Sequence, residues 1–220
     1  MKIEIKTTND GSQTLYVPEL DEHYHSYHGA IQEAKHVFLA NGLDAVQSDE
    51  ISILEIGWGT GLNALLTALW SMEHQKKIRY TGLEAYPVPV DMNLMLNYPQ
   101  LVEEKDSQLI FETMVRAEWE AFVQIHPLFQ LKKQCAFIQT WEQEQLFDIA
   151  FYDAFGPRAQ SEMWEIKVLE KVIHALKPEG IFVTYCAKGQ LKRDLKELGC
   201  DVVSLPGPPG KREMVRAWKI

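Results

Sequence analysis

Hydrophobic and polar positions along the chain change their period several times, and each period predicts a type of element. Residues 1–17 alternate apolar and polar side chains around Asn9-Asp10-Gly11, which is typical of a β-hairpin. From Gly29 to Asn41 the apolar residues recur at helical spacing, so a helix is expected there.

From residue 51 onward, short apolar runs alternate with helical patterns. We predict strands at 51–56, 78–84, 131–138, 147–152, 180–186, 202–205 and 214–218. We predict helices at 62–72, 89–96, 161–176 with Ser161 as N-cap, and 190–198 closed by Gly199. The stretch 98–130 is mostly helical in pattern, with Trp119, Phe122 and Val123 on one face.

This alternation of strands and helices predicts an α/β fold, a largely parallel sheet with helices on both faces. Only "PGPPGKRE" separates the last two strands, so they are expected to form an antiparallel hairpin at a sheet edge. At 220 residues the chain is expected to be a single domain. Within it, residues 1–45 form a hairpin and helix extension and residues 46–220 the core.

The composition indicates the cellular compartment in which the protein is expected. The chain is 46% hydrophobic, yet it contains no apolar run of about 18 residues, so no membrane span is expected. Its three cysteines, Cys135, Cys186 and Cys200, are scattered and odd in number. We therefore expect small buried thiols in a reducing cytoplasm, not disulfides or a zinc site.

The charge is unevenly distributed. The formal net charge is -9, but residues 158–220 contain 12 Lys and Arg against 8 Asp and Glu. This basic C-terminal part could hold a polyanion locally, although scattered solvated side chains would give the same count.

A glycine-rich loop follows the strand 51–56. The stretch Glu55-Ile56-Gly57-Trp58-Gly59-Thr60-Gly61 has the form E-x-G-x-G-x-G. It lacks the Gly-Lys-Ser/Thr end of a P-loop, and its spacing differs from the G-x-G-x-x-G dinucleotide fingerprint. An acid beside bare backbone suits a ligand with a cationic amino acid end and no phosphates, such as S-adenosylmethionine.

Two further strand ends carry acids. Glu84 ends the strand 78–84, where a carboxylate can accept hydrogen bonds from both ribose hydroxyls. Asp153 follows the strand 147–152 and precedes Ala154-Phe155-Gly156-Pro157, a loop expected to face the substrate. An acid and an aromatic ring there could hold an amine and stack a base. A capping role for Asp153 and a core role for Phe155 are the structural alternatives.

Taken in order, the motifs "GWGTGLN", "LEAYP", "YDAFGP…EMW" and "GKREM" resemble the tRNA 5-methylaminomethyl-2-thiouridine methyltransferases. The resemblance covers roughly residues 20–219, and it is to the methyltransferase domain without the fused FAD-dependent oxidase domain. It implies a Rossmann-like class I fold with seven strands and an antiparallel last strand. The implied reaction N-methylates the 5-aminomethyl group of 2-thiouridine at the tRNA wobble position, with S-adenosyl-L-methionine as donor.

The resemblance also implies roles for individual residues. Glu55 and the three loop glycines would cradle the methionine end of the donor, and Glu84 would hold its ribose. Asp153 and Phe155 would be catalytic and face the target base. The expected cofactor-binding set is Glu55, Gly57, Trp58, Gly59, Thr60, Gly61, Asn63, Glu84, Ala85, Gln139, Trp141 and Asp153. The expected substrate-binding set is Tyr24, His25, Ser26, Phe155, Gly156, Pro157, Arg158, Lys211 and Arg212.

One part of the family pattern is missing. Many class I enzymes carry an acid after the third strand that reads adenine, whereas this chain has Ile138-Gln139-Thr140-Trp141 there. Gln139 could bond adenine and Trp141 could pack beside it. The histidines of "HYHSYH" lack a completing acid or thiol, so no metal site is expected.

Three other functions compete with this interpretation. A methyltransferase acting on a protein or small-molecule amine would share the same cofactor half. A non-catalytic cofactor-binding subunit would not need Asp153. A nicotinamide oxidoreductase fails on glycine spacing. A separate FAD-dependent oxidase is the expected partner that supplies the aminomethyl nucleoside.

Overall fold

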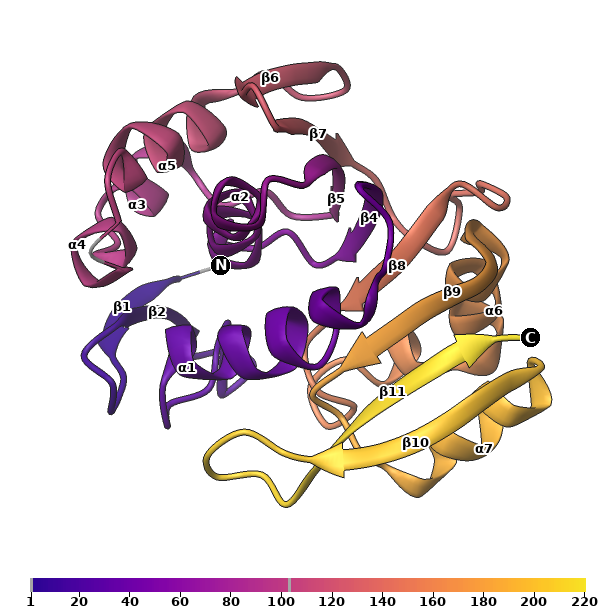
Figure 1. The fold of residues 1–220 in the computed structure, drawn as a ribbon. Helices are drawn as coiled ribbons and strands as arrows, with labels where there is room; N and C mark the ends of the chain where they lie inside the picture. Colours follow the sequence, from indigo (N-terminus) through magenta and orange to yellow (C-terminus); the bar gives the residue numbers. More distant parts are fainter. Residues whose placement is uncertain (1, 103) are drawn as a thin grey trace.

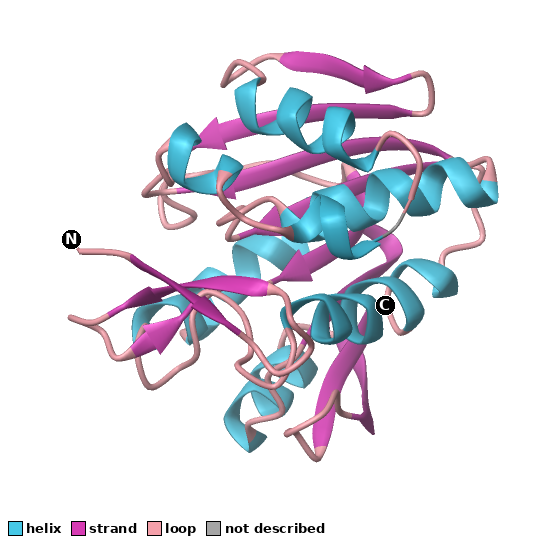
Figure 2. Cartoon of the chain, turned by 90° about the vertical axis from the view of Figure 1, so that its left-hand side faces the viewer, coloured by secondary structure: helices cyan, strands magenta, loops and turns pink. Residues whose placement is uncertain are grey.

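Two sheets organise the computed structural model, which describes residues 2–102 and 104–220. A three-stranded antiparallel sheet has the order β1-β2-β3, and an eight-stranded sheet has the order β10-β11-β9-β8-β4-β5-β7-β6 (Figure 1). The small N-terminal sheet stands beside the large one, near the ends of its strands (Figure 2).

The strands are β1 (Glu4–Thr7), β2 (Gln13–Val17), β3 (Glu22–His23), β4 (Glu50–Ile56), β5 (Lys77–Glu84), β6 (Phe122–His126), β7 (Phe129–Cys135), β8 (Phe147–Tyr152), β9 (Leu176–Thr184), β10 (Cys200–Pro206) and β11 (Glu213–Lys219). The helices are α1 (Ala30–Ala34), its π-helical continuation η1 (Lys35–Ala40), α2 (Leu62–His74), α3 (Val90–Leu94), α4 (Tyr98–Val102), α5 (Ser107–Arg116), α6 (Ile166–Ala175) and α7 (Gly189–Glu197). Short 3-10 turns lie at η2 (Leu43–Ala45) and η3 (Ser161–Trp164).

The central strand β4 pairs in parallel with β5 on one side and β8 on the other. Because side chains alternate across a strand, each strand contributes to two separate cores. Ile53 and Phe151 pack with helices α2 and α5 on one face. Leu54 and Ala150 pack with α6 and α7 on the other. Such burial on both faces accounts for the nearly continuous apolar runs of these strands.

Most predicted elements are confirmed. The N-terminal hairpin pairs β1 with β2, and the chain is helical over residues 30–40, with Gly29 and Asn41 as the flanking caps. The last two strands form the expected antiparallel hairpin, with β10 at the sheet edge and β11 antiparallel to β9. The mostly parallel α/β sheet and the helices at 62–74 and 189–197 also agree.

The helical interpretation of 98–130 is wrong in its second half. Residues 122–126 form strand β6, which pairs antiparallel with β7 and adds an eighth strand to the expected seven. The spacing of Trp119, Phe122 and Val123 matches one face of a helix, but pairing with β7 makes residues 122–126 a strand. Phe122 instead packs under the Arg79 guanidinium, 4.1 Å from its ring centroid.

Two smaller expectations also fail. Ser161 is not the N-cap of α6, because residues 161–164 form a 3-10 turn and α6 begins at Ile166 after Glu165. Cys135 is exposed at the end of β7, whereas Cys186 and Cys200 are buried as expected. Within the described residues, no helix has both the length and the apolar character needed to cross a membrane.

Candidate active site

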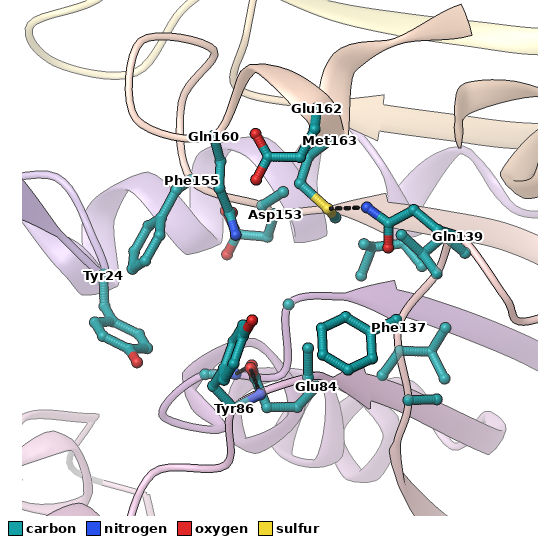
Figure 3. A pocket seen from close by; sticks show the side chains of 18 of the residues that line it. Tyr24, Glu84, Tyr86, Phe137, Gln139, Asp153, Phe155, Gln160, Glu162 and Met163 are labelled. Carbon is teal, nitrogen blue, oxygen red and sulfur yellow. Dashed lines mark hydrogen bonds between the residues drawn. The ribbon is translucent and has the colours of Figure 1, made fainter. Parts of the chain in front are cut away.

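A cavity of about 500 Å³ opens where strands β4, β5, β7 and β8 end. Its lining comes from the residues directly after these strands and from the N-terminal segment around Tyr24. Figure 3 shows Asp153 and Met163 on one side of the cavity, with Glu84 and Tyr86 facing them. Ligands of open α/β sheets bind at this position, outside the carboxyl ends of the strands.

The glycine loop forms one wall through its backbone. Gly57 and Trp58 both donate their N–H groups to the Leu83 carbonyl, at 3.0 and 2.9 Å, which fixes the loop against β5. Gly57 has φ of +88°, and a Cβ there would lie 2.7 Å from the Asp153 carbonyl oxygen. Only glycine therefore fits where the loop passes β8.

Glu84 is oriented by the same loop. Its Oε2 accepts a hydrogen bond from the Gly59 N–H and its Oε1 accepts one from the Tyr86 N–H, both at 2.9 Å. Each carboxylate oxygen has a second acceptor site, and the side chain lines the cavity. Glu84 can therefore accept two hydroxyl donors from a bound ligand.

Asp153 stands at the end of β8, with its N–H donating to the Ile56 carbonyl at 3.0 Å. Its Oδ2 accepts a 2.7 Å hydrogen bond from Asn63 Nδ2. The same nitrogen donates to Glu55 Oε1 at 2.8 Å. Asn63 and Glu55 are almost fully buried and do not line the cavity, whereas Asp153 does.

The protonation of Asp153 is shifted toward neutral pH. Burial, reinforced by the Glu33 carboxylate, raises the pKa of Asp153 to about 7, against the opposing effects of Asn63 and Lys211. Burial and the neighbouring Asp153 raise the pKa of Glu55 well above its ordinary value. An acid with a pKa near 7 can exchange a proton with a bound amine.

An aromatic cap covers one side of the cavity. Tyr24 and Phe155 meet edge to face with their ring centroids 5.0 Å apart (Figure 3). Burial raises the pKa of Tyr24 to about 12, so its hydroxyl stays protonated.

His25 also lines the cavity and is neutral. Its Nε2 lies 2.8 Å from Thr60 Oγ1, and burial lowers the pKa of His25 to about 4.

A charged pair joins the C-terminal hairpin loop to α1. Lys211 forms an ion pair with Glu33 of α1, and its ammonium lies 3.8 Å from the Tyr185 ring centroid. The Tyr185 hydroxyl donates to the Ala154 carbonyl at 2.8 Å. Lys211 thus connects the C-terminal hairpin loop to the residue that follows Asp153.

The structure brings nine of the predicted site residues to the cavity surface and leaves the others outside it. Those that line it are Tyr24, His25, Gly57, Gly59, Glu84, Ala85, Gln139, Asp153 and Phe155. Those outside the lining are Ser26, Glu55, Trp58, Thr60, Gly61, Asn63, Trp141, Gly156, Pro157, Arg158, Lys211 and Arg212.

Several of the outer residues support the lining instead. Trp58 is 3% exposed and packs under the glycine loop against Tyr80. Thr60 receives the Tyr98 hydroxyl at 3.1 Å, and Gly61 precedes the first residue of α2. Trp141 packs on Phe147 in the core and does not line the cavity.

Sequence reasoning missed much of the apolar lining. Tyr86 and Phe137 project from the ends of β5 and β7 and meet edge to face, with centroids 5.6 Å apart. Met163 lies opposite them, and its Sδ accepts a 3.6 Å hydrogen bond from Gln139 Nε2 (Figure 3). Both rings lie two positions after the end of a strand. Because ligands bind at the carboxyl ends of the strands, this spacing could have identified Tyr86 and Phe137 in the sequence.

Much of the predicted basic face is neutralised internally. Lys192 pairs with Glu213 at 2.7 Å, and Arg158 lies 3.7 Å from Glu22. In the described part of the chain, Lys188, Arg193 and Arg212 are exposed and form no ion pair. Across residues 2–102 and 104–220, no group of three His, Cys, Asp or Glu side chains could hold a metal ion.

Sequence relatives were found along nearly the whole chain. Residues 128–220 match a family model described as S-adenosyl-L-methionine-dependent methyltransferase. The tRNA 5-methylaminomethyl-2-thiouridine biosynthesis bifunctional protein MnmC of Cupriavidus necator is 29% identical over 224 residues, 93% of this chain and 33% of that protein. The protein of the same name from a Marinomonas species is 30% identical over 219 residues, 89% of this chain and 31% of that protein. The chain therefore spans about a third of the length of the curated relatives it matches.

Solved structures agree on the fold. MNMC2 from Aquifex aeolicus superposes with a TM-score of 0.74 at 24% identity, covering 98% of this chain and 70% of that one. The amino pentose methyltransferase CalS10 from Micromonospora echinaspora, bound to SAM, gives a TM-score of 0.52 at 11% identity over 87% and 92% of the two chains. The chain thus has the fold of S-adenosylmethionine-dependent methyltransferases, and the predicted resemblance is confirmed by its relationship to the proteins of tRNA 5-methylaminomethyl-2-thiouridine biosynthesis.

Proposed function

We propose that this protein N-methylates the 5-aminomethyl group of 2-thiouridine at the tRNA wobble position, with S-adenosyl-L-methionine as donor. The observation that carries the proposal is one cavity in which Glu84, the glycine loop and Asp153 converge. The names of the relatives, which refer to tRNA 5-methylaminomethyl-2-thiouridine biosynthesis, support the choice of nucleoside.

The cavity fits the donor in size and chemistry. Its volume of about 500 Å³ lies in the range of small-molecule sites. Glu84 would hold the ribose hydroxyls, and the apolar surfaces of Tyr86, Phe137 and Ile138 would enclose the adenine. Gly57 and Gly59 would present bare backbone to the methionine end. The bound donor would supply an electrophilic methyl group on a sulfonium centre.

Asp153 would bind and orient the substrate amine. The amine must be neutral to offer its lone pair, and an ionised Asp153 can accept the proton that leaves the nitrogen as the new bond forms. A pKa near 7 suits this exchange. Most of the acceleration would come from holding the two reactants in position. Tyr24 and Phe155 would stack on the target base from the cap.

The tRNA backbone would contact the C-terminal face. Arg212 is exposed and forms no ion pair within the described residues, and the same is true of Lys188 and Arg193, so these three are the candidates for phosphate contacts. Lys211, held by Glu33, would instead order the edge of the active site. We infer further that a separate FAD-dependent oxidase supplies the aminomethyl nucleoside.

The direct test uses purified protein, S-adenosylmethionine and tRNA from cells unable to perform this methylation. Digested tRNA would be analysed for nucleosides by mass spectrometry. Loss of the 5-aminomethyl nucleoside with gain of its N-methyl product is expected. If the tRNA is unchanged while S-adenosylmethionine still binds, the substrate is a protein or a small-molecule amine.

A further inference from the structure

Three polar side chains, one from each of three elements, meet at the floor of the cavity: Glu55 and Asn63 are buried, and Asp153 is half-buried and lines the cavity. Glu55 comes from β4, Asn63 from α2 and Asp153 from the end of β8. The single Asn63 nitrogen donates both of its hydrogens, one to Glu55 Oε1 at 2.8 Å and one to Asp153 Oδ2 at 2.7 Å. Two carboxyl groups are therefore tied to one amide, and only one of them, Asp153, lines the cavity.

Glu55 lies in surroundings that do not support a negative charge. Its residue is 1% exposed, and its Oε2 has no hydrogen-bond partner among the described residues. The buried Tyr80 hydroxyl lies nearby and lowers the pKa of Glu55, but burial and the Asp153 carboxylate raise this pKa by more. A buried carboxylate oxygen without a donor is strongly disfavoured relative to the protonated acid.

On the basis of the proposed function, we propose that Asn63 is a positioning residue for Asp153 and that Glu55 is its neutral partner at physiological pH. The array then offers one ionisable carboxyl to the substrate amine, at a fixed position. This differs from the role expected for Glu55 in the sequence, where its charge would hold the cationic end of the donor.

The charges around Asp153 are consistent with a single titrating member. Glu33 of α1 raises the pKa of Asp153, while Lys211 of the hairpin loop lowers it. Tyr80 on β5 and Tyr185 after β9 are neutral hydroxyls whose pKa values are raised by burial. Glu84 acts on Glu55, whose pKa it raises in addition to the larger effects of burial and Asp153.

The decisive experiment observes the carboxyl carbons directly, by NMR of protein carrying 13C-labelled Asp and Glu. The signals would be assigned with Asp153→Asn and Glu55→Gln. We expect Asp153 to titrate near pH 7 and Glu55 to keep the chemical shift of a protonated acid from pH 6 to 8. A Glu55 signal of an ionised carboxylate across that range would overturn the proposal.

Two variants test the coupling. Asn63→Ala removes a hydrogen bond to the charged form of Asp153, so the titration midpoint of Asp153 should rise by about one pH unit. Glu55→Gln resembles the neutral acid, so it should leave the Asp153 midpoint unchanged and the dissociation constant for S-adenosylmethionine within about threefold. A tenfold weaker donor affinity in Glu55→Gln would mean that Glu55 acts as a charge.

Asn93→Ala is the matched control, because Asn93 is also a buried asparagine with an unpartnered Oδ1 but lies on α3. It should lower the thermal midpoint without moving the titration of Asp153. If Asn63→Ala gave only the same thermal loss, Asn63 would have no positioning role. None of these readouts needs tRNA methylation, so failure of the proposed substrate and failure of this array remain distinguishable.

Discussion

The wall of the cavity that we propose holds the donor and the aromatic cap that we propose faces the amine are assembled differently. The donor wall is largely contained in one β4-α2-β5 unit, where the glycine loop bonds to Leu83 and to Glu84. The other side combines the aromatic cap of Tyr24 and Phe155 with Lys211 outside the lining, and these residues come from three distant segments of the chain. Local sequence therefore specifies the donor wall, whereas the tertiary fold specifies the cap.

The largest expected effect separates the two regions at Asp153. Asp153→Asn keeps the size of the side chain but removes the proton acceptor, so kcat for methylation should fall by about 10²-fold to 10⁴-fold. Binding of S-adenosylmethionine, measured by calorimetry, should be retained because the glycine loop and Glu84 are unchanged. A variant that kept more than about half the rate with unaltered tRNA affinity would exclude the base role.

The donor wall should be most sensitive at Gly57. In Gly57→Ala the new Cβ would lie 2.7 Å from the Asp153 carbonyl at a φ of +88°, so the loop must move. We expect at least about tenfold weaker S-adenosylmethionine binding, equivalent to about 1.4 kcal/mol. Gly199→Ala is the matched control, because Gly199 has φ of +80° but open space around it. Equal losses of donor affinity in both variants would show that the steric contact is unimportant.

The ion pair between Lys211 and Glu33 should control the pH dependence. Lys211→Met removes the cation that lowers the pKa of Asp153, so the acid limb of kcat/KM should move to higher pH. Glu33→Gln removes the carboxylate that raises this pKa and leaves Lys211 unpaired, so the limb should move to lower pH. Activity is lost below the pKa because Asp153 must be ionised to accept a proton.

These opposite shifts, each of order one pH unit, would be measured from pH-rate profiles. Lys192→Met breaks a 2.7 Å ion pair with Glu213 in the same hairpin region and serves as the control. If the acid limb of kcat/KM stayed at the same pH in both Lys211→Met and Glu33→Gln, it would report the pKa of the substrate amine and not that of Asp153.

The smallest effect concerns tRNA affinity. Arg212→Glu should weaken tRNA binding several-fold and reduce the slope of log K against log salt by about 1, as expected for one lost phosphate contact. Arg116→Glu, an exposed residue at the end of α5 near the opposite sheet edge, is the control. Equal salt slopes for the two variants would locate the tRNA elsewhere.

The same contrast explains what could be predicted from sequence. Glycines that adopt positive φ next to a strand end leave a local signature, and the acid Glu84 follows at fixed spacing, so the place of these residues at the cavity could be predicted. Their contacts with the donor stay a prediction. Which residues are buried and which line the cavity could not be predicted from the sequence. Trp141 and Glu55 have the right residue types near the right strands, but packing turns them away from the cavity.

Strand β6 illustrates the same limit in the fold. Residues 119–123 place apolar side chains at spacings that suit a helix, and only pairing with β7 reveals the strand. The resemblance places Lys211 in contact with tRNA or at the edge of the active site, and its ion pair with Glu33, far away along the chain, is visible only in the structure. Long-range contacts of this kind leave no periodic signal in a single sequence.

The ion pair between Glu33 and Lys211 has a consequence for biosynthesis. Its partners are separated by 178 positions, so this contact forms only after nearly the whole described chain has left the ribosome. The β4-α2-β5 unit is complete much earlier, and segments synthesised first can fold first. A nascent chain would therefore acquire its donor-facing wall before the charge balance at Asp153 is set.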